Sequence, residues 1–172
     1  GQGRVPTHEK LDIDVPAGVS TGRQLRVKGY GEAGLRGAPS GDLIVTIQVE
    51  EHERFVRRGD DLYCDVAVSI AQAALGCKVQ VTGIMPDETV TVTVPAGTQY
   101  GEMVRAAEFG MPRSGDGARG SLYARVVITV PKKLNREARE ALEKYARAVG
   151  DEFEAPRSVG DRIRDAIDDI ID

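Results

Sequence analysis

The sequence has no tryptophan, two histidines, two cysteines and no long apolar run among its 172 residues. Its longest uncharged stretch that leans apolar runs from Val66 to Cys77, which is well short of the roughly 18 residues that a membrane helix needs. Two cysteines cannot supply the dense disulfide framework of a small secreted domain, and no basic and then apolar segment marks a secretory signal. We therefore expect no membrane insertion and a reducing, cytoplasmic location.

Residue types that usually carry catalysis are also scarce. Neither His8 nor His52 stands beside a recognisable nucleophile motif. Cys64 and Cys77 form no Cys-x-x-Cys pair, so we expect buried thiols rather than a zinc site. The glycine-rich stretches lack the Gly-x-x-x-x-Gly-Lys-Ser/Thr pattern of a phosphate-binding loop. We therefore expect a protein that is not an enzyme, with no metal and no cofactor in this chain.

The charge is unevenly distributed. Hydrophobic residues make up 41% of the chain and the net charge is only −4, a combination that excludes a disordered chain. Residues 151–172 hold eight acids and three bases, whereas the first 150 residues hold 20 bases and 19 acids. The acidity therefore belongs to a C-terminal tail. A mildly acidic chain has no general attraction for nucleic acid, and we expect none to bind directly.

The sequence repeats itself at an offset of 79 residues. Residues 11–49, the first repeat, and residues 90–128, the second repeat, are identical at nine of 39 positions without a gap, where unrelated sequences would share about two or three. The Val-Pro-Ala-Gly run at 15–18 recurs at 94–97, and many mismatches exchange one apolar residue for another. We interpret the two repeats as an internal duplication.

Alternating residues predict the strands of each repeat. Leu11, Ile13 and Val15 alternate with aspartates, and residues 89–94 show the same period. Each of these strands ends at a Pro-Ala-Gly turn. The other predicted strands are residues 24–28 and 42–50 in the first repeat and 103–107 and 121–130 in the second. Glycine-rich loops at 29–41 and 108–120 connect them, so each repeat predicts a small antiparallel β-sandwich.

The second repeat has a leader, about Gly59 to Thr89, that the first repeat lacks. In this leader we expect strands at 62–68 and 78–82 and, between them, a short helix capped by Ser69 and ended by Gly76. The first repeat could have the same leader only if the chain extended about twenty residues upstream of Gly1. Either the first domain is naturally shorter, or the chain begins inside it, and the abrupt start at Gly1-Gln2-Gly3 favours the second alternative.

Two more helices are expected near the C-terminus. Asn135 caps the first, and Gly150 ends it. Beyond a linker at 155–158, Ser158 and Asp161 resemble a capping box that starts the second. That helix carries an apolar stripe for which a twin helix from a second copy is the simplest partner: Val159, Ile163, Ile167, Ile170 and Ile171.

These patterns together predict the fold class. We expect a mainly β protein with two tandem small β-sandwich domains related by an internal duplication, followed by C-terminal helices. The expected domains are residues 1–57, a first β-domain without its N-terminal strands; residues 58–131, a second β-domain; and residues 132–172, a helical segment with a dimerisation helix.

Two apolar rows in the first repeat have two possible roles. One row is Leu11, Ile13 and Val15, and the other lies on alternate residues between 43 and 49. Either both rows fill a sandwich core, or missing upstream strands leave them uncovered as a groove for an extended apolar peptide.

Several motifs, in order, resemble the DnaJ family of J-domain co-chaperones, in its zinc-finger-containing class. The run His8-Glu-Lys-Leu-Asp-Ile-Asp-Val-Pro-Ala-Gly-Val, the stretch Lys28-Gly-Tyr-Gly-Glu-Ala-Gly and the segment from Ala38-Pro-Ser-Gly-Asp-Leu resemble the first C-terminal domain of that family. His52-Glu-Arg-Phe-Val-Arg-Arg-Gly-Asp-Asp-Leu-Tyr-Cys resembles the start of the second. The resemblance covers essentially the whole chain, but no His-Pro-Asp of a J domain occurs and the zinc-finger cysteines are absent.

The resemblance implies a function and a set of site residues. It implies a co-chaperone that binds exposed apolar segments of unfolded clients, prevents aggregation and, in the full-length protein, hands clients to a DnaK-type ATPase through the missing J domain. The implied client-binding residues are Leu11 and Val45, with Ile13 and Leu43 as strand neighbours; Val90 and Ala124 are their equivalents in a smaller second pocket. The implied partners are unfolded or partly folded proteins and a second copy of the chain, joined by the last helix. Zinc is expected only in the missing zinc-finger module.

Two other classes of function stay open. The chain is alternatively a structural or assembly module that binds one specific folded partner, in which case unfolded peptides would not compete for its surface. A hydrolase with an unrecognised carboxylate pair would require two strongly perturbed acids in a cleft.

Overall fold

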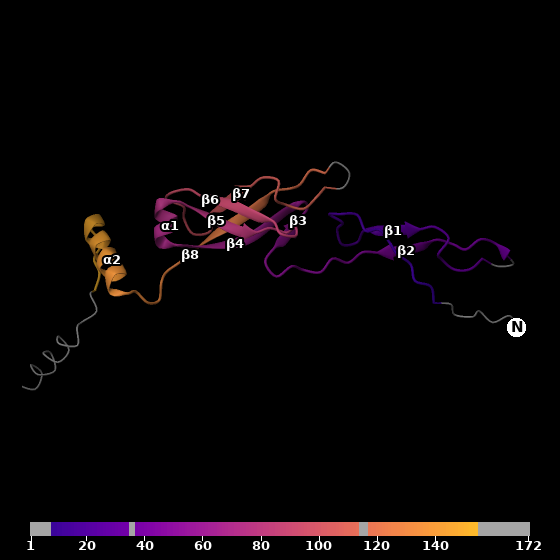
Figure 1. Ribbon diagram of the computed structural model, residues 1–172, viewed down its shortest axis with the longest axis horizontal. Coiled ribbons are helices and arrows are strands. Elements are labelled where there is room, and N and C mark those ends of the chain that lie inside the picture. Colours follow the sequence, from indigo (N-terminus) through magenta and orange to yellow (C-terminus); the bar gives the residue numbers. More distant parts are fainter. Residues whose placement is uncertain (1–7, 35–36, 114–116, 155–172) are drawn as a thin grey trace, which may run out of the picture. The chain divides into compact units, whose positions relative to one another are not determined.

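The protein is mainly β, as the sequence predicts. The computed structural model describes residues 8–34, 37–113 and 117–154 and separates into two compact units, Gly1–Val130 and Pro131–Asp172. The described residues form eight strands and two helices (Figure 1). In chain order these are β1 (Gln24–Val27), β2 (Leu43–Thr46), β3 (Val56–Arg58), β4 (Asp61–Ser69), α1 (Ile70–Leu75), β5 (Cys77–Thr82), β6 (Thr89–Val94), β7 (Met103–Ala106), β8 (Leu122–Thr129) and α2 (Arg136–Val149).

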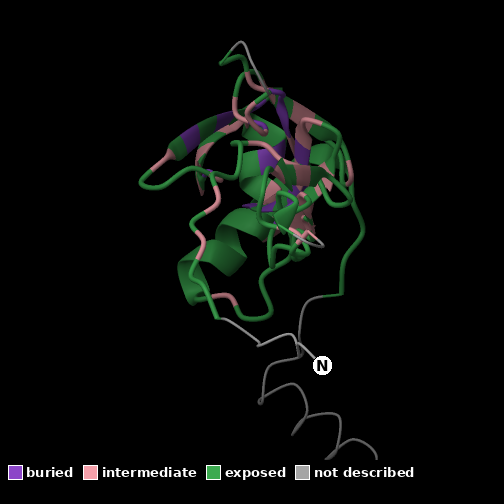
Figure 2. Ribbon diagram, turned by 90° about the vertical axis from the view of Figure 1, so that its right-hand side faces the viewer, coloured by how far each residue is buried: buried purple, intermediate pink, exposed green. Residues whose placement is uncertain are grey.

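The core of the protein lies in the second repeat and its leader, the second sandwich (residues 55–129). One sheet has the order β3-β4-β8-β7 and the other pairs β5 with β6. Every second residue of β4 and β6 is buried, and so are Leu122, Ala124 and Val126 on β8. These residues form one cluster, and the ribbon is purple at buried positions in Figure 2. The largest fully buried side chains are Leu62, Val68, Val90, Val92, Val94, Leu122 and Val126. The period of two thus places one apolar face of each strand inside the sandwich.

The large sheet is mixed rather than antiparallel. β4 and β8 run parallel, in a register from Leu62 opposite Leu122 to Ser69 opposite Thr129. The prediction of a purely antiparallel sandwich is therefore wrong for the second repeat. Parallel neighbours need a long crossover, and the segment from α1 through β7 provides it.

Local signals place both helices correctly. Ser69 and Gln72 form a reciprocal capping box at the start of α1, and Gly76 ends that helix. Asn135 accepts a hydrogen bond from the backbone N–H of Ala138 at the start of α2, and Gly150 ends α2 in the left-handed conformation. None of the described residues of α2 is buried.

The first repeat is less complete. β1 and β2 form an antiparallel pair from Gln24 opposite Thr46 to Val27 opposite Leu43, and no residue described between 8 and 50 is buried. Residues 11–15 form no strand, so the predicted strand there is wrong. Its counterpart β6 is paired with β5, whereas none of the described segments forms a ladder with residues 11–15. The alternating pattern is present, but a strand also needs a hydrogen-bonding partner.

The two repeats nevertheless share a hydrogen-bonding pattern. The N–H of Gly22 donates to the carbonyl of Ile47, and 79 residues later Gly101 donates to Val126, each at 2.8 Å. Two further pairs follow the same offset: Gly31 to Gly41 with Gly110 to Gly120, and Gly41 to Glu32 with Gly120 to Met111. Each repeat therefore closes its glycine-rich loop in the same way. A common origin by duplication stays a prediction.

Candidate functional site

The β1–β2 hairpin presents an apolar face. Leu43 and Val45 on β2 are half-buried, whereas Ile44 between them is 50% exposed and points to the opposite face. The register places Leu25 opposite Val45 and Val27 opposite Leu43, and both β1 residues are also half-buried. Four aliphatic side chains therefore share one side of this hairpin, which we call the apolar face.

The other predicted client-binding residues lie on a separate segment. Leu11 and Ile13 are half-buried and Val15 is 52% exposed, but residues 11–15 are not hydrogen-bonded to β2 as a strand. The hydrophobic core of the described residues includes none of these side chains. Of the four predicted residues, the structure thus brings Leu43 and Val45 onto one face. Their role in binding stays a prediction.

The smaller second pocket, predicted at Val90 and Ala124, is closed. Both side chains have 0% exposure, because β5 and β6 cover the inner face of β4 and β8. A peptide cannot reach them in the folded protein, and that prediction is wrong.

An ion pair lies at the end of the apolar face, beside Leu43. The guanidinium of Arg26 pairs with the carboxylate of Asp42, which also accepts a 3.0 Å hydrogen bond from the backbone N–H of Gly29. The Gly29 hydrogen bond and then Arg26 lower the pKa of Asp42 below its ordinary value. The charge at this end of the hairpin is therefore balanced.

Among the cavities in the described part of the chain, two with largely apolar walls are not lined by any predicted client-binding residue. One of about 570 Å³ is bordered by Val56, Tyr63, Met103 and Arg125 among others. The second, of about 610 Å³, is bordered by Val49, Phe55, Ile84 and Met111 among others. Sequence reasoning did not identify either cavity, because their walls combine residues far apart in the chain.

The outer face of the large sheet also carries an aromatic pair. Tyr63 on β4 stacks on Tyr123 on β8, with ring centroids 5.1 Å apart and planes 15° apart, and the guanidinium of Arg58 lies over the Tyr63 ring. The parallel register places the two tyrosines opposite each other. In the sequence, both tyrosines occupy outward-facing positions of alternating strands. This pattern predicts that they pair only if β4 and β8 are already known to be neighbours.

The side chains of His52, Asp60 and Asp61 each have a structural partner. Nδ1 of His52 accepts a hydrogen bond from the backbone N–H of Arg54. Asp60 pairs with Arg113, whereas Asp61 accepts a 2.7 Å hydrogen bond from the backbone N–H of Ser121, so these neighbouring acids have separate partners. Burial, and then the nearby Asp65, raise the pKa of the Cys64 thiol, which is buried as predicted, while Cys77 is half-buried.

Neither a metal-binding cluster nor a membrane-spanning helix occurs among the described residues. No group of three or more His, Cys, Asp or Glu side chains is placed to hold a metal ion within the part of the chain described. No helix among those residues is long and apolar enough to cross a membrane.

The predicted dimerisation residues cannot be placed. Val159, Ile163, Ile167, Ile170 and Ile171 all lie outside the described residues. Their role stays a prediction.

One element was missed entirely. β3 is only three residues long, crosses the predicted domain boundary at 57/58 and pairs with β4 through Arg57 opposite Leu62. Its sequence, Val-Arg-Arg, has no apolar alternation, so no periodic signal marks it.

Comparison with known proteins identifies the family. The family model described as the DnaJ C terminal domain matches residues 3–131. Among curated proteins, the chain is 38% identical over 168 residues to the Chaperone protein DnaJ of Acetivibrio thermocellus, covering 97% of this chain and 43% of that protein. It is 42% identical over 154 residues to the Chaperone protein DnaJ of Clostridium beijerinckii, a match that covers 90% of this chain and 40% of that protein. It is 41% identical over 167 residues to the Chaperone protein DnaJ of Methanothermobacter thermautotrophicus, a match that covers 97% of this chain and 44% of that protein.

The chain thus spans about two fifths of the length of the curated relatives that it matches. The family match covers most of the chain and includes both repeats. This chain belongs to the DnaJ C terminal domain family.

Proposed function

We propose that this chain binds exposed apolar segments of unfolded or partly folded proteins and so prevents their aggregation. The observation that supports this proposal is the apolar face of the first repeat. Leu43 and Val45 there are half-buried, while Leu122 and Ala124, the residues 79 positions later, are 1% and 0% exposed. The first repeat therefore keeps accessible the apolar positions that the second repeat uses as core.

Binding at this face is noncovalent and modest. Burying one Leu-sized side chain of a client contributes roughly 1.5–3 kcal/mol, from which the cost of ordering client and binding site is subtracted. A few such contacts hold a client reversibly. Two copies of the chain acting together would raise the effective affinity.

The rest of the proposal concerns the whole protein. The relatives carry the name Chaperone protein DnaJ and are more than twice as long as this chain. We include in the proposal the delivery of clients to a DnaK-type ATPase, a homodimer joined through residues 158–172, and a cytoplasmic location. None of these needs covalent chemistry in this chain.

The test replaces the apolar surface by polar side chains. We expect the double variant Leu11→Ser with Val45→Ser to weaken suppression of client aggregation, because it makes two of the predicted contact residues polar. The melting temperature should barely change, because neither residue is in the core. Light scattering of a chemically unfolded client during dilution measures the first effect, and circular dichroism measures the second.

The matched control is Ile44→Ser, on the same strand but on the opposite face. It should suppress aggregation as the wild type does. Unfolding of the double variant would assign Leu11 and Val45 to a core and contradict the proposal. The wild type could instead bind one folded protein that unfolded peptides do not displace. That result would support an assembly module.

A further inference from the structure

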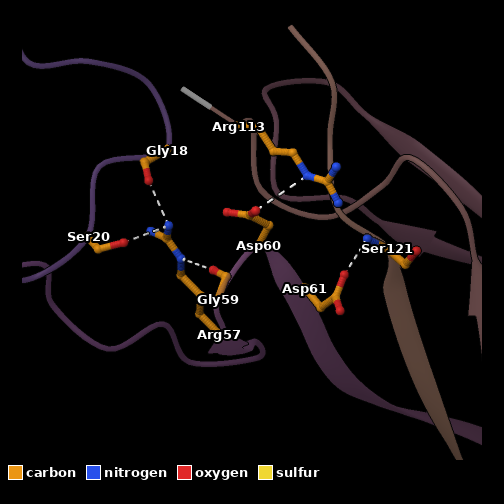
Figure 3. Close-up of polar contacts among 8 residues, drawn as sticks. All are labelled: Gly18, Ser20, Arg57, Gly59, Asp60, Asp61, Arg113 and Ser121. Carbon is orange, nitrogen blue, oxygen red and sulfur yellow. Dashed lines mark hydrogen bonds and ion pairs between the residues drawn. The ribbon is translucent and has the colours of Figure 1, made fainter. Parts of the chain in front are cut away.

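Arg57 on β3 is hydrogen-bonded to the turn that follows residues 11–15. Its Nη2 donates to the carbonyl of Gly18 at 2.6 Å and to Oγ of Ser20 at 3.1 Å, and its Nη1 donates to the carbonyl of Val19 at 2.7 Å. Nε donates to the carbonyl of Gly59 at 2.8 Å, which orients the guanidinium (Figure 3). One half-buried side chain of the second sandwich thus binds three consecutive residues of the first repeat.

The same turn touches a second segment of the second sandwich. Gly18 has φ +75°, and a Cβ atom at this position would lie 1.9 Å from the carbonyl oxygen of Pro112. Only glycine fits both this conformation and this close approach. The turn is therefore in contact with Arg57 and with the Pro112 loop.

The Pro112 loop is itself fixed to the second sandwich. The guanidinium of Arg113 pairs with the carboxylate of Asp60 at 3.3 Å, and the N–H of Met111 donates to the carbonyl of Asp60 at 2.8 Å. Asp61, next in the chain, accepts a hydrogen bond from the N–H of Ser121 (Figure 3). A turn bound to Arg57 and Pro112 is thus bound to a rigid part of the second sandwich.

The equivalent turn of the second repeat is held differently. There the N–H of Gly97 donates to the carbonyls of Ala73 and Ala74 in α1, at 2.9 and 3.1 Å. That turn is anchored inside its own sandwich, whereas the turn at Gly18 is anchored by Arg57 of the next domain. The two repeats therefore share a Pro-Ala-Gly turn but use it for different connections.

We propose that Arg57 is a positioning residue that fixes the first repeat to the second sandwich through the turn Gly18–Ser20. Arg57, this turn and Pro112 form what we call the joint. Three of the four acceptors are neutral carbonyls and the fourth is a hydroxyl, so the joint does not depend on the titration of an acid. The guanidinium is a planar fork with several donors in fixed directions, and a lysine cannot reproduce it.

The joint has a consequence for client binding, and this step rests on the proposed function. Leu11 and Ile13 are followed within seven residues by the turn that Arg57 holds. With the joint formed, this segment has a fixed direction relative to the second sandwich. A long client that contacts both regions then meets them in a constant arrangement, whereas a short peptide that contacts only the first repeat does not sense it.

The test measures domain orientation by residual dipolar couplings of backbone amides in the full chain. For the wild type, couplings from residues 8–50 and 59–129 should fit a single alignment tensor. For Arg57→Ala and Arg57→Lys they should require two, because each hydrogen bond from a charged donor changes a docking equilibrium by roughly tenfold or more. Arg58→Ala is the matched control: it removes the same charge one residue later, at a side chain that lies over Tyr63 instead.

A second pair of variants separates docking from backbone strain. Gly18→Ala and Gly22→Ala both place a side chain at positive φ, but only the Cβ at Gly18 meets Pro112, and nothing lies within 4 Å of a Cβ at Gly22. We expect two tensors for Gly18→Ala and one for Gly22→Ala. Slow labelling of the buried Cys64 thiol in every variant shows that the second sandwich stays folded.

The outcomes are distinct for the two proposals. A single tensor for Arg57→Ala with a folded second sandwich overturns the joint, as does a wild type that already needs two tensors. If the wild type binds no client at all, the proposed function fails while the couplings still decide the joint. If both proposals hold, Arg57→Ala binds a short apolar peptide with unchanged affinity but suppresses aggregation of a long client severalfold less well.

Discussion

Leu43 and Leu122 occupy the same place in the two repeats, yet only Leu122 is part of a core. Leu122 is 1% exposed and lies on β8, next to the parallel strand β4. Leu43 lies on β2, whose only described partner is β1. The same residue in the same local pattern is therefore core in one repeat and accessible surface in the other, and the difference comes from the strands that cover it.

The largest expected effect is on the core itself. Leu122→Ala should lower the free energy of unfolding by about 2–5 kcal/mol, because it opens a cavity among tightly packed residues. Leu43→Ala should lower it by about 1 kcal/mol or less, since half-exposed atoms lose little burial. Guanidinium unfolding of both variants measures the gap. Equal losses would mean that the two repeats are equally well packed.

A smaller effect on stability is expected from a largely buried ion pair of the second sandwich. The guanidinium of Arg119 lies against the Glu88 carboxylate, with side chains only 19% and 14% exposed, and this hydrogen bonding lowers the pKa of Glu88 below its ordinary 4.5. A lowered pKa of an acid stabilises the fold above its unfolded-state pKa, and that stabilisation is lost as the pH falls through the folded-state pKa.

Glu88→Gln should therefore reduce stability at pH 7, by about 1–3 kcal/mol, and the deficit relative to the wild type should shrink as the pH falls below about 4.5. Urea unfolding of both proteins at pH 7 and pH 3 measures this. A deficit that is independent of pH would show that the charge of Glu88 contributes nothing.

The smallest effect is expected at the exposed pair of the first repeat. Asp42→Asn keeps an acceptor for the N–H of Gly29 but removes the charge that faces Arg26, whose side chain is 68% exposed. Exposed pairs contribute little and are screened by salt, so the urea midpoint should be nearly unchanged and the same at low and high salt. A loss comparable to that of Glu88→Gln would contradict this assignment.

Local patterns predicted the elements that depend on local physics. The caps at Ser69 and Asn135 and the alternation in β6 appear in the structure where the sequence places them. The parallel pairing of β4 with β8 was missed, because register between distant strands leaves no local trace. Residues 11–15 show the converse error, in which a strand pattern has no partner to form a ladder with.

The candidate site was only partly predictable for the same reason. Apolar alternation identified Leu43 and Val45, but whether such residues are covered depends on other strands. Arg57 carried no signal at all, since a lone arginine in a short charged stretch is typical of solvent-exposed surface. Its role follows from the carbonyls that face it, and these become visible only in three dimensions.

The parallel pairing of β4 and β8 also affects how the protein is made. The two strands are 60 residues apart in register, and contacts so distant in sequence slow folding. At a synthesis rate of roughly 5–20 residues per second, β4 leaves the ribosome about 3–12 seconds before its neighbour. During that interval the edge of β4 that later pairs with β8 has no hydrogen-bonding partner. For those few seconds the nascent chain therefore exposes an unpaired strand edge, the kind of surface that promotes aggregation.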